Sequence, residues 1–309
     1  MNFDNIIDYS KKVNENQVVK NDLLFSSKEF NCFNSDKCDL LYVHQTSKVS
    51  MIFGVRDNKL IAPFSAPFSF IRYGSNDLKL RHLDDFYQTL ISDVNLEPRI
   101  DTVSITLPPY FYDQSMITKN SIALFNAGFE IAYRDINSHI DIRSHCFNTL
   151  GSSSKKAIRA SKRFKHEICL AKEDITKERA YLIIKENREL KGYPLRMTWE
   201  QVQSTTREVA ECDYFYVETE GQLSAAAIVF HINKSAVQVV YWGANEHGEK
   251  HGVMYFLPFE LIEYYRTRGF KYIDIGPSSE NGKVSYGLND YKQMIGCVNT
   301  IKETWVYSK

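Results

Sequence analysis

The stretch that decides the fold reads AVQVVYWGA at 236–244, NEHGEKHG at 245–252, VMYFLPFELIEYYRTRGF at 253–270 and KYIDIG at 271–276. Its first and last segments are short apolar runs rich in Val, Ile and Tyr, which predicts two strands. Between them, Met254, Leu257 and Leu261 recur at helical spacing, and Gly269 follows as a C-terminal stop. The order strand, glycine-containing loop, helix and strand is typical of an α/β protein.

The flanking sequence extends this unit into a domain. Upstream lie DYFYVETE at 213–220 and LSAAAIVFHI at 223–232, and short turn segments join them to the strand at 236–244. Such tight spacing predicts an antiparallel meander. We also expect helices at 155–164, 175–190 and 198–210, a strand at 166–173, a short helix at 288–295 and a closing strand at 299–307.

The first half predicts a second α/β unit. Residues 38–145 read as β-β-β-α-β-α-β-β, with a hairpin turn at Asp57-Asn58 and a helical stripe that begins at Leu80. Residues 1–36 are polar and predict one or two short helices with loops. Gly151 is followed by three serines, which are typical of a loop and a helix cap. We therefore expect two domains, 1–150 and 151–309.

Composition excludes several classes of protein. Apolar residues make up 43% of the 309 residues, and 38 basic residues balance 38 acidic ones, so the protein as a whole is not a polycation suited to DNA. The six cysteines are scattered without a C-x-x-C pair, which predicts no metal site. No signal peptide or apolar run long enough to span a membrane is evident, so we expect a cytoplasmic protein without integral membrane contact.

The stretch from Tyr241 to Gly296 resembles the C-terminal domain of the FemABX group of the GNAT superfamily. The matching pieces are YWGAN at 241–245, the helix that ends at Gly269-Phe270, YIDIG at 272–276 and GLNDYKQMIG at 287–296. The helix in SSSKKAIRASKRF and the loop IAPFSAPFSF at 61–70 resemble further parts of these proteins. The resemblance implies two GNAT-like domains, each a mixed, mostly antiparallel sheet flanked by helices, and transfer of acyl or aminoacyl groups to amines.

The resemblance also implies a site for the acyl donor where the strands at 236–244 and 272–276 splay apart. A helix N-terminus with glycines can hold a phosphate, whereas an ordinary strand-to-helix turn is the alternative reading of 246–252. This segment lacks the Gln/Arg-x-x-Gly-x-Gly/Ala loop of GNAT enzymes that use acyl-CoA. The candidate donor-binding residues are Tyr241, Trp242, Gly243, His247, Gly248, Lys250 and Gly252.

Lys292 is the first catalytic candidate. Many GNAT enzymes carry a tyrosine acid four residues before the glycine that corresponds to Gly296, so the resemblance places Lys292 beside the leaving group. An ammonium there can stabilise negative charge; the alternative is a solvated lysine on a short helix. Tyr291 and Tyr286 are alternative acids. Asp274, between two isoleucines, either orients Lys292 or the acceptor, or caps a loop at the strand end.

The basic helix at 155–165 is the candidate acceptor site. Lys155, Arg159 and Lys162 share one face, and we expect Ala157, Ala160 and Phe164 to form the buried face. The basic face suits the phosphates of a nucleotide-linked acceptor or a tRNA end, unless it is only a solvated surface.

Three functions remain. The first is N-acyl transfer, with acetyl-CoA or another acyl-CoA as donor, to a small-molecule or nucleotide-linked amine of a cell-wall or polysaccharide precursor. The second is aminoacyl-tRNA-dependent transfer to peptidoglycan precursors. The third is an inactive GNAT-like pair of domains that serves as a binding module. No metal is expected in any of them.

Overall fold

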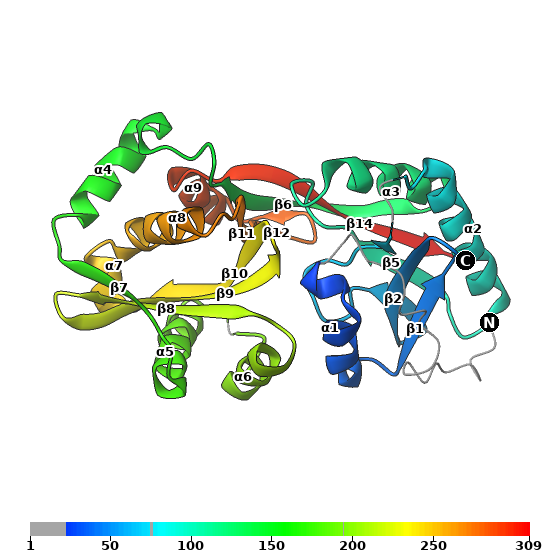
Figure 1. The fold of residues 1–309 in the computed structure, drawn as a ribbon, viewed down its shortest axis with the longest axis horizontal. Helices are drawn as coiled ribbons and strands as arrows, with labels where there is room; N and C mark the ends of the chain where they lie inside the picture. The colour runs from blue at the N-terminus through cyan, green and yellow to red at the C-terminus, as the bar shows by residue number, and fades with distance from the viewer. Residues whose placement is uncertain (1–22, 75–76, 194) are drawn as a thin grey trace. The chain divides into compact units, whose positions relative to one another are not determined.

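The computed structural model describes residues 23–74, 77–193 and 195–309 (Figure 1). The contacts divide the chain into two units: residues 1–136, 281–283 and 300–309 form unit 1, and residues 137–280 and 284–299 form unit 2. The division therefore falls at 136 rather than at the expected 150. The reason is that the end of β6 (Glu130–Asp141) pairs with β11 (Tyr272–Pro277) of unit 2, while β14 (Val298–Ser308) pairs with β5 (Thr102–Thr106) of unit 1.

Unit 2 is built on a sheet with the strand order β6-β11-β10-β9-β8-β7. Its further strands are β7 (His166–Leu170), β8 (Cys212–Thr219), β9 (Gln222–Asn233) and β10 (Ala236–Ala244). The strands β8 to β10 form the predicted antiparallel meander, β7 adds to it by antiparallel pairing with β8, and β10 and β11 are the parallel pair. A small hairpin, β12 (Ser279–Glu280) and β13 (Lys283–Val284), follows β11 and was not predicted.

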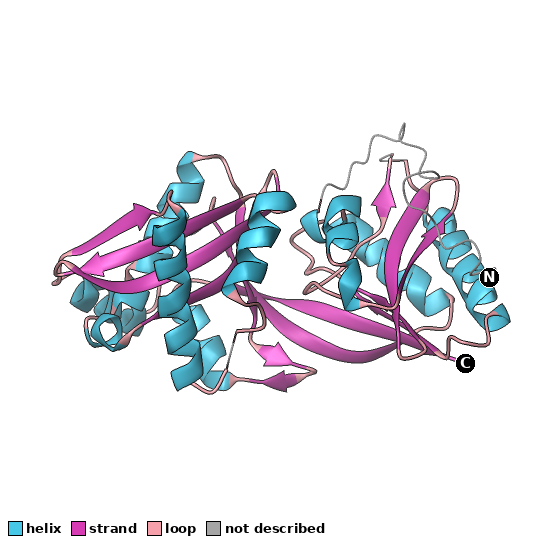
Figure 2. Cartoon of the chain, turned by 90° about the horizontal axis from the view of Figure 1, so that it is seen from below, coloured by secondary structure: helices cyan, strands magenta, loops and turns pink. Residues whose placement is uncertain are grey.

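Helices cover both faces of this sheet. The helices α5 (Asp174–Leu190) and α6 (Trp199–Glu208) lie on one face and α8 (Leu257–Thr267) on the other (Figures 1 and 2). Leu257, Leu261 and Tyr265 of α8 are buried in the apolar core. Burial of one such side chain contributes about 1.5–3 kcal/mol. The Tyr265 hydroxyl also donates to Asp213 on β8 at 2.9 Å, which ties the helix to the sheet.

Local signals set the ends of these helices. Thr198 and Gln201 form a reciprocal capping box at the start of α6. Gly269 adopts a φ of +81° after α8, so the predicted stop is confirmed. The expected helix start near Val253 is wrong: Val253–Tyr255 is a separate 3-10 turn, and α8 begins at Leu257 with Pro258 in its first turn.

Three further helices complete unit 2. They are α4 (Ser152–Ser161), α7 (Glu246–Lys250) and α9 (Tyr286–Met294). The predicted buried face of α4 is wrong, because Ser154, Ile158 and Ser161 are its buried residues, whereas Ala160 and Phe164 are exposed. Ile158 is the large apolar residue of the helix, so the helix face that carries Ile158 is the buried one.

Unit 1 has the strand order β1-β2-β3-β5-β14-β6, and β4 (Arg72–Tyr73) pairs with β2. Its remaining strands are β1 (Leu40–Gln45), β2 (Val49–Arg56) and β3 (Lys59–Ala62), and its helices are α1 (Lys28–Phe33), α2 (Leu80–Leu96) and α3 (Gln114–Asn126). Asp57 and Asn58 both have positive φ, which confirms the predicted hairpin turn. The expectation for residues 1–22 lies outside the described residues, and the one or two strands expected at 131–143 form one strand, β6.

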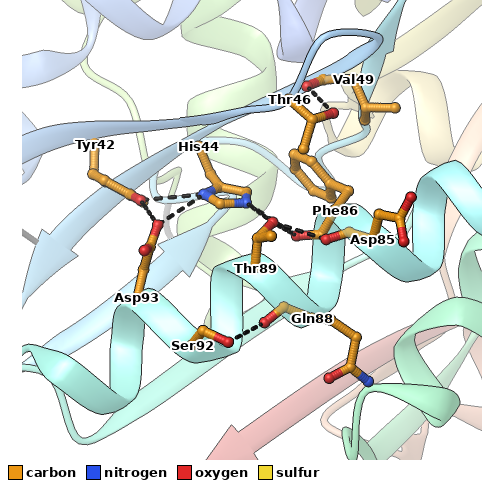
Figure 3. Close-up of polar contacts among 10 residues, drawn as sticks. All are labelled: Tyr42, His44, Thr46, Val49, Asp85, Phe86, Gln88, Thr89, Ser92 and Asp93. Carbon is orange, nitrogen blue, oxygen red and sulfur yellow. Dashed lines mark hydrogen bonds and ion pairs between the residues drawn. The ribbon is translucent and has the colours of Figure 1, made fainter.

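A buried histidine fastens α2 to β1 (Figure 3). His44 Nε2 lies 3.0 Å from the carbonyl oxygen of Phe86, an acceptor, so Nε2 carries the hydrogen. The Tyr42 hydroxyl donates to Asp93 Oδ2 at 3.2 Å, and its oxygen lies 3.2 Å from Nδ1 of His44. Burial lowers the pKa of His44, so the neutral ring is the stable form in the folded protein.

Candidate active site

The parallel strands β10 and β11 are paired over only three residues. The pairs are Ala236 with Tyr272, Val237 with Ile273, and Gln238 with Asp274. Beyond them β10 continues to Ala244 and β11 to Pro277 without further pairing between the two strands. Parallel strands present backbone donors and acceptors along their whole length. The register confirms the predicted splay, and we call this place the fork.

A break in regular register accompanies the fork on each strand. The pairing of β10 with β9 shifts between Val239 and Tyr241, and the pairing of β11 with β6 shifts between Asp274 and Gly276. Bulges of this kind bend a strand and re-aim its side chains, and they are frequent beside active sites. Gly276 has a φ of +78°, a conformation that side chains other than glycine rarely adopt.

Asp274 holds the fork together at its closed end. The side chain is fully buried, and Oδ1 accepts from Asn137 Nδ2 on β6 and from the backbone N–H of Gly276, both at 2.8 Å. Oδ2 accepts from Gln238 Nε2 on β10 at 2.9 Å. Three donors from three strands offset the cost of burying this carboxylate. Asp274 therefore positions the strands, which goes beyond the loop-capping alternative.

Lys292, on α9, lies at the end of β11. Its side chain is buried, with the residue only 2% exposed, and Nζ donates to the carbonyl oxygens of Gly276 and Pro277, each at 2.8 Å. The solvated-lysine alternative is therefore wrong. An ammonium has three hydrogens, and the third has no hydrogen-bond partner among residues 23–74, 77–193 and 195–309.

Burial lowers the pKa of Lys292 from 10.5 to about 8. Nearby charges modify this effect: Cys297 and Asp274 raise the pKa, and Arg188 lowers it. With a pKa of about 8, about nine in ten molecules carry the ammonium at pH 7. The group is thus charged near neutral pH and gives up its proton more easily than an ordinary lysine.

Cys297 lies in the apolar core of unit 2, near enough to Lys292 to influence its pKa. Burial raises the pKa of this thiol to about 12. Because the thiolate is the nucleophilic form, a thiol that stays protonated is unsuited to covalent catalysis. The structure therefore agrees with a packing role for Cys297.

The tyrosine candidates differ from Lys292 in their surroundings. The Tyr291 hydroxyl donates to the carbonyl oxygen of Met254 at 2.8 Å, and burial raises the pKa of Tyr291 well above 10. Its ring packs against Trp242 and Tyr255. The structure gives Tyr291 and Trp242 a packing role. Tyr286, at the start of α9, is 76% exposed.

The segment predicted to hold a phosphate forms a short helix with acidic residues in its first turn. Residues 246–250 form the five-residue helix α7, whose first turn carries Glu246 and Glu249, and the Asn245 side chain already accepts from the Gly248 N–H. Two carboxylates at this end oppose an anion. The position of the segment after an apolar strand favours a phosphate site. In the folded protein the Asn245 side chain already accepts from the Gly248 N–H at this helix end.

The glycines of this segment serve packing and turn formation. A Cβ on Gly248 would overlap the Ser224 carbonyl of β9, so α7 sits directly on the sheet. Gly252 has a φ of +66°. His247 Nε2 lies 3.1 Å from the carbonyl oxygen of Thr219, which directs this ring to the end of β8, and Lys250 is exposed.

The open arm of β10 carries Tyr241 and Gly243. Gly243 lies under Asn187 of α5, whose Nδ2 donates to the Ala244 carbonyl at 2.6 Å. Tyr241 is half-buried, and Arg188 is among the charges that influence its pKa. Arg188 was not among the sequence candidates, because a single arginine in a helix that reads NREL has no distinguishing motif.

The three basic candidates of α4 have different surroundings. Lys155 Nζ donates to the carbonyl oxygen of Asn148 at 2.8 Å, and the Arg159 guanidinium lies 5.8 Å from the ring centre of Phe147. Lys162 is exposed and near Glu260. None of these contacts removes the positive charge, so α4 presents a cationic surface.

Two features are absent from the described residues. No group of three or more histidine, cysteine, aspartate or glutamate side chains that could hold a metal ion occurs there. In the same residues, none of the helices combines the length and the apolar character needed to cross a bilayer.

Comparison with solved structures identifies the fold. FemX matches with a TM-score of 0.65 at 11% identity over 95% of this chain and 94% of that one. The C-terminal DUF2156 domain of an Agrobacterium fabrum protein assigned as a lysylphosphatidylglycerol synthetase matches with a TM-score of 0.58 at 10% identity, over 91% and 87%. L-PGS from Bacillus licheniformis matches with a TM-score of 0.58 at 11% identity, over 87% and 84%.

No protein-family model matches the sequence, and no curated protein matches it either. The structural neighbours therefore carry the identification of the fold, and at these identities they identify the fold alone. The chain has the FemABX-like tandem GNAT fold that its C-terminal residues resemble.

Proposed function

We propose that this protein transfers an aminoacyl group to an amine, with the activated carbonyl lying in the fork of unit 2. One observation carries the proposal: pairing of β10 with β11 stops at Gln238 and Asp274, and a buried ammonium, Lys292, stands at the end of β11. The gap in pairing between β10 and β11 suits an extended ligand, and the ammonium suits an oxygen that becomes negative.

The chemistry needs positioning and electrostatics more than a nucleophile on the protein. The neutral amine of the acceptor attacks the carbonyl carbon, a C–N bond forms, and the ester C–O bond to the donor breaks. Lys292, with one hydrogen free of partners among the described residues, donates to the carbonyl oxygen as charge develops there. Because the pKa of Lys292 is lowered to about 8, the same group can pass a proton to the departing oxygen, and the proton that the attacking nitrogen loses restores the ammonium.

Two observations favour aminoacyl-tRNA over acyl-CoA as the donor. The first turn of α7 carries Glu246 and Glu249 where a pyrophosphate was expected. α4 presents Lys156 and Arg159 to solvent, and Lys162 and Arg163 directly after it are also exposed, which suits a polyanion. One structural neighbour is assigned as a lysylphosphatidylglycerol synthetase, a name that specifies an aminoacyl product. As acceptor we propose an amine of a cell-wall or surface-polysaccharide precursor.

The test uses tRNA charged with labelled amino acids and amino-sugar nucleotides or peptidoglycan precursors as acceptors. We expect transfer by the wild-type protein and a loss of about 10²–10³-fold in kcat for Lys292→Met, which keeps the side-chain length and removes the charge. Lys172→Met is the matched control, because Lys172 is an exposed lysine of the same unit. Binding of charged tRNA should weaken steeply with salt.

The outcomes separate the three functions. Turnover of acetyl-CoA without any use of charged tRNA would overturn the proposed donor. Binding of charged tRNA or acceptor that is equally strong in the wild-type and Lys292→Met proteins, with no transfer by either, would indicate the binding module instead.

A further inference from the structure

Arg188 belongs to the last turn of α5, the helix that packs on the open arm of β10. Its neighbour Asn187 fixes this turn on the strand, because Nδ2 donates to the Ala244 carbonyl at 2.6 Å and Oδ1 lies against Gly243. Arg188 is half-buried and lies near Tyr241 of the same arm and near Lys292 of α9. Its guanidinium is therefore placed beside the fork.

This guanidinium forms no hydrogen bond or ion pair within the part of the chain that the structure describes. Other arginines of unit 2 are engaged: Arg196 pairs with Glu280, Arg207 with Asp174 and Arg266 with Glu263. An arginine side chain stays charged in proteins and carries five donors. Partial burial of such a group without an anion is unfavourable.

The second cation makes the arrangement still less favourable in the absence of a ligand. Lys292 is buried and lies near enough for the Arg188 charge to lower its pKa. The Asp274 carboxylate, which also influences the pKa of Lys292, already accepts hydrogen bonds from Asn137, Gln238 and the Gly276 N–H. An unpaired guanidinium and a buried ammonium that influence each other's charge favour a ligand that is an anion.

We propose that Arg188 binds an anionic group, a carboxylate or a phosphate, on the substrate that occupies the fork. The inference rests on the proposed function for the location of that substrate and adds the chemical class that the substrate must carry. A guanidinium binds both oxygens of a carboxylate or phosphate at once. Arg188 then fixes the anion, and Lys292 remains available for the reacting carbonyl.

A direct binding experiment tests this without any transfer assay. The full-length protein is labelled with ¹⁵N-arginine, and the Nε–Hε signal of Arg188 is assigned from its loss in Arg188→Lys. Inorganic pyrophosphate and N-acetylglycine are titrated separately at constant ionic strength. We expect one of them to shift the Arg188 signal in a saturable manner, and the one that does so distinguishes phosphate from carboxylate.

Arg179 provides the matched control, because it is an exposed arginine of the same helix. Its signal should not move in a saturable way. An Arg188 signal that neither probe shifts, or that moves only as the Arg179 signal does, would overturn the proposal. This binding result does not depend on the transfer reaction, so it tests the anion site at Arg188 independently of the proposed transfer activity.

A kinetic arm uses the transfer reaction where it is observed. We expect Arg188→Gln to raise the KM for the anionic substrate by about tenfold or more with a smaller change in kcat, because a ground-state contact is lost. Arg188→Lys should recover part of the affinity, and Arg179→Gln should match the wild type. Equal kinetic constants in Arg188→Gln and the wild type would contradict the proposal, provided circular dichroism shows both proteins folded.

Discussion

Replacement of Lys292 by methionine tests the buried ammonium through stability as well as through activity. Lys292 is 2% exposed, and burial lowers its pKa from 10.5 to about 8. Below pH 8 the folded protein must hold a charged group that water would solvate better. Above pH 8 the folded protein holds a neutral amine while the unfolded chain still binds a proton, so the free energy of unfolding rises with pH.

The magnitude follows from the two pKa values. A pKa difference of one corresponds to about 1.4 kcal/mol, so the buried ammonium costs the fold about 3 kcal/mol at neutral pH. Proton linkage between the folded and unfolded states recovers about 2 kcal/mol of this cost between about pH 7 and about pH 9.5. Methionine carries no proton, so the variant lacks this gain.

The assay is urea unfolding of both proteins at the two pH values. Other groups titrate in both proteins, so the quantity of interest is the difference in free energy of unfolding, wild type minus variant. We expect this difference to increase by about 2 kcal/mol towards the higher pH. The control pair, wild type and Lys172→Met, should show no such increase, because Lys172 is exposed. A difference for Lys292→Met that stays constant with pH would refute the buried, perturbed ammonium.

Three further predictions concern the fold around this site and in unit 1. We expect Asp274→Asn to lower the free energy of unfolding by about 2–4 kcal/mol in urea titrations, because an amide cannot accept from all three donors. The same change should lower the pKa of Lys292 further, as ¹⁵N-lysine spectra would reveal. The pKa of His44 lies below 6.5, so the stability of unit 1 should fall as pH drops below about 6.5, and His44→Gln should abolish this loss in thermal scans (Figure 3). Gly248→Ala should lower the melting temperature more than Gly252→Ala, because only the former places a Cβ against the Ser224 carbonyl.

Much of the fold could be predicted from sequence because the signals are local. Alternation and turn residues placed the meander β8-β9-β10, and the Asp57-Asn58 turn predicted the first hairpin. Helical spacing and Gly269 located α8, although Pro258 moved its start beyond Val253. These features depend on residues that are close in the chain, and their physical chemistry does not require the rest of the molecule.

The site was predicted only in part. Lys292 and Asp274 were reached through a resemblance over about fifty residues, but their roles depend on partners far away in sequence. Asp274 is held by Asn137, and Lys292 caps carbonyls that precede it by fifteen and sixteen residues. The phosphate site at 246–252 stays a prediction, because glycines that permit close packing and glycines that admit a ligand look alike in sequence.

The amino-acid sequence by itself determined the elements, their order and the group of proteins that the second half resembles, because periodicity, turns and caps act within a few residues. Only the tertiary structure decided that β10 and β11 separate after Gln238, that Lys292 is buried with its charge, and that Arg188 stands beside them. Pairing, desolvation and the presence or absence of a counter-charge arise between segments distant in the chain. For that reason they appear once the chain has folded and cannot be inferred from any single stretch.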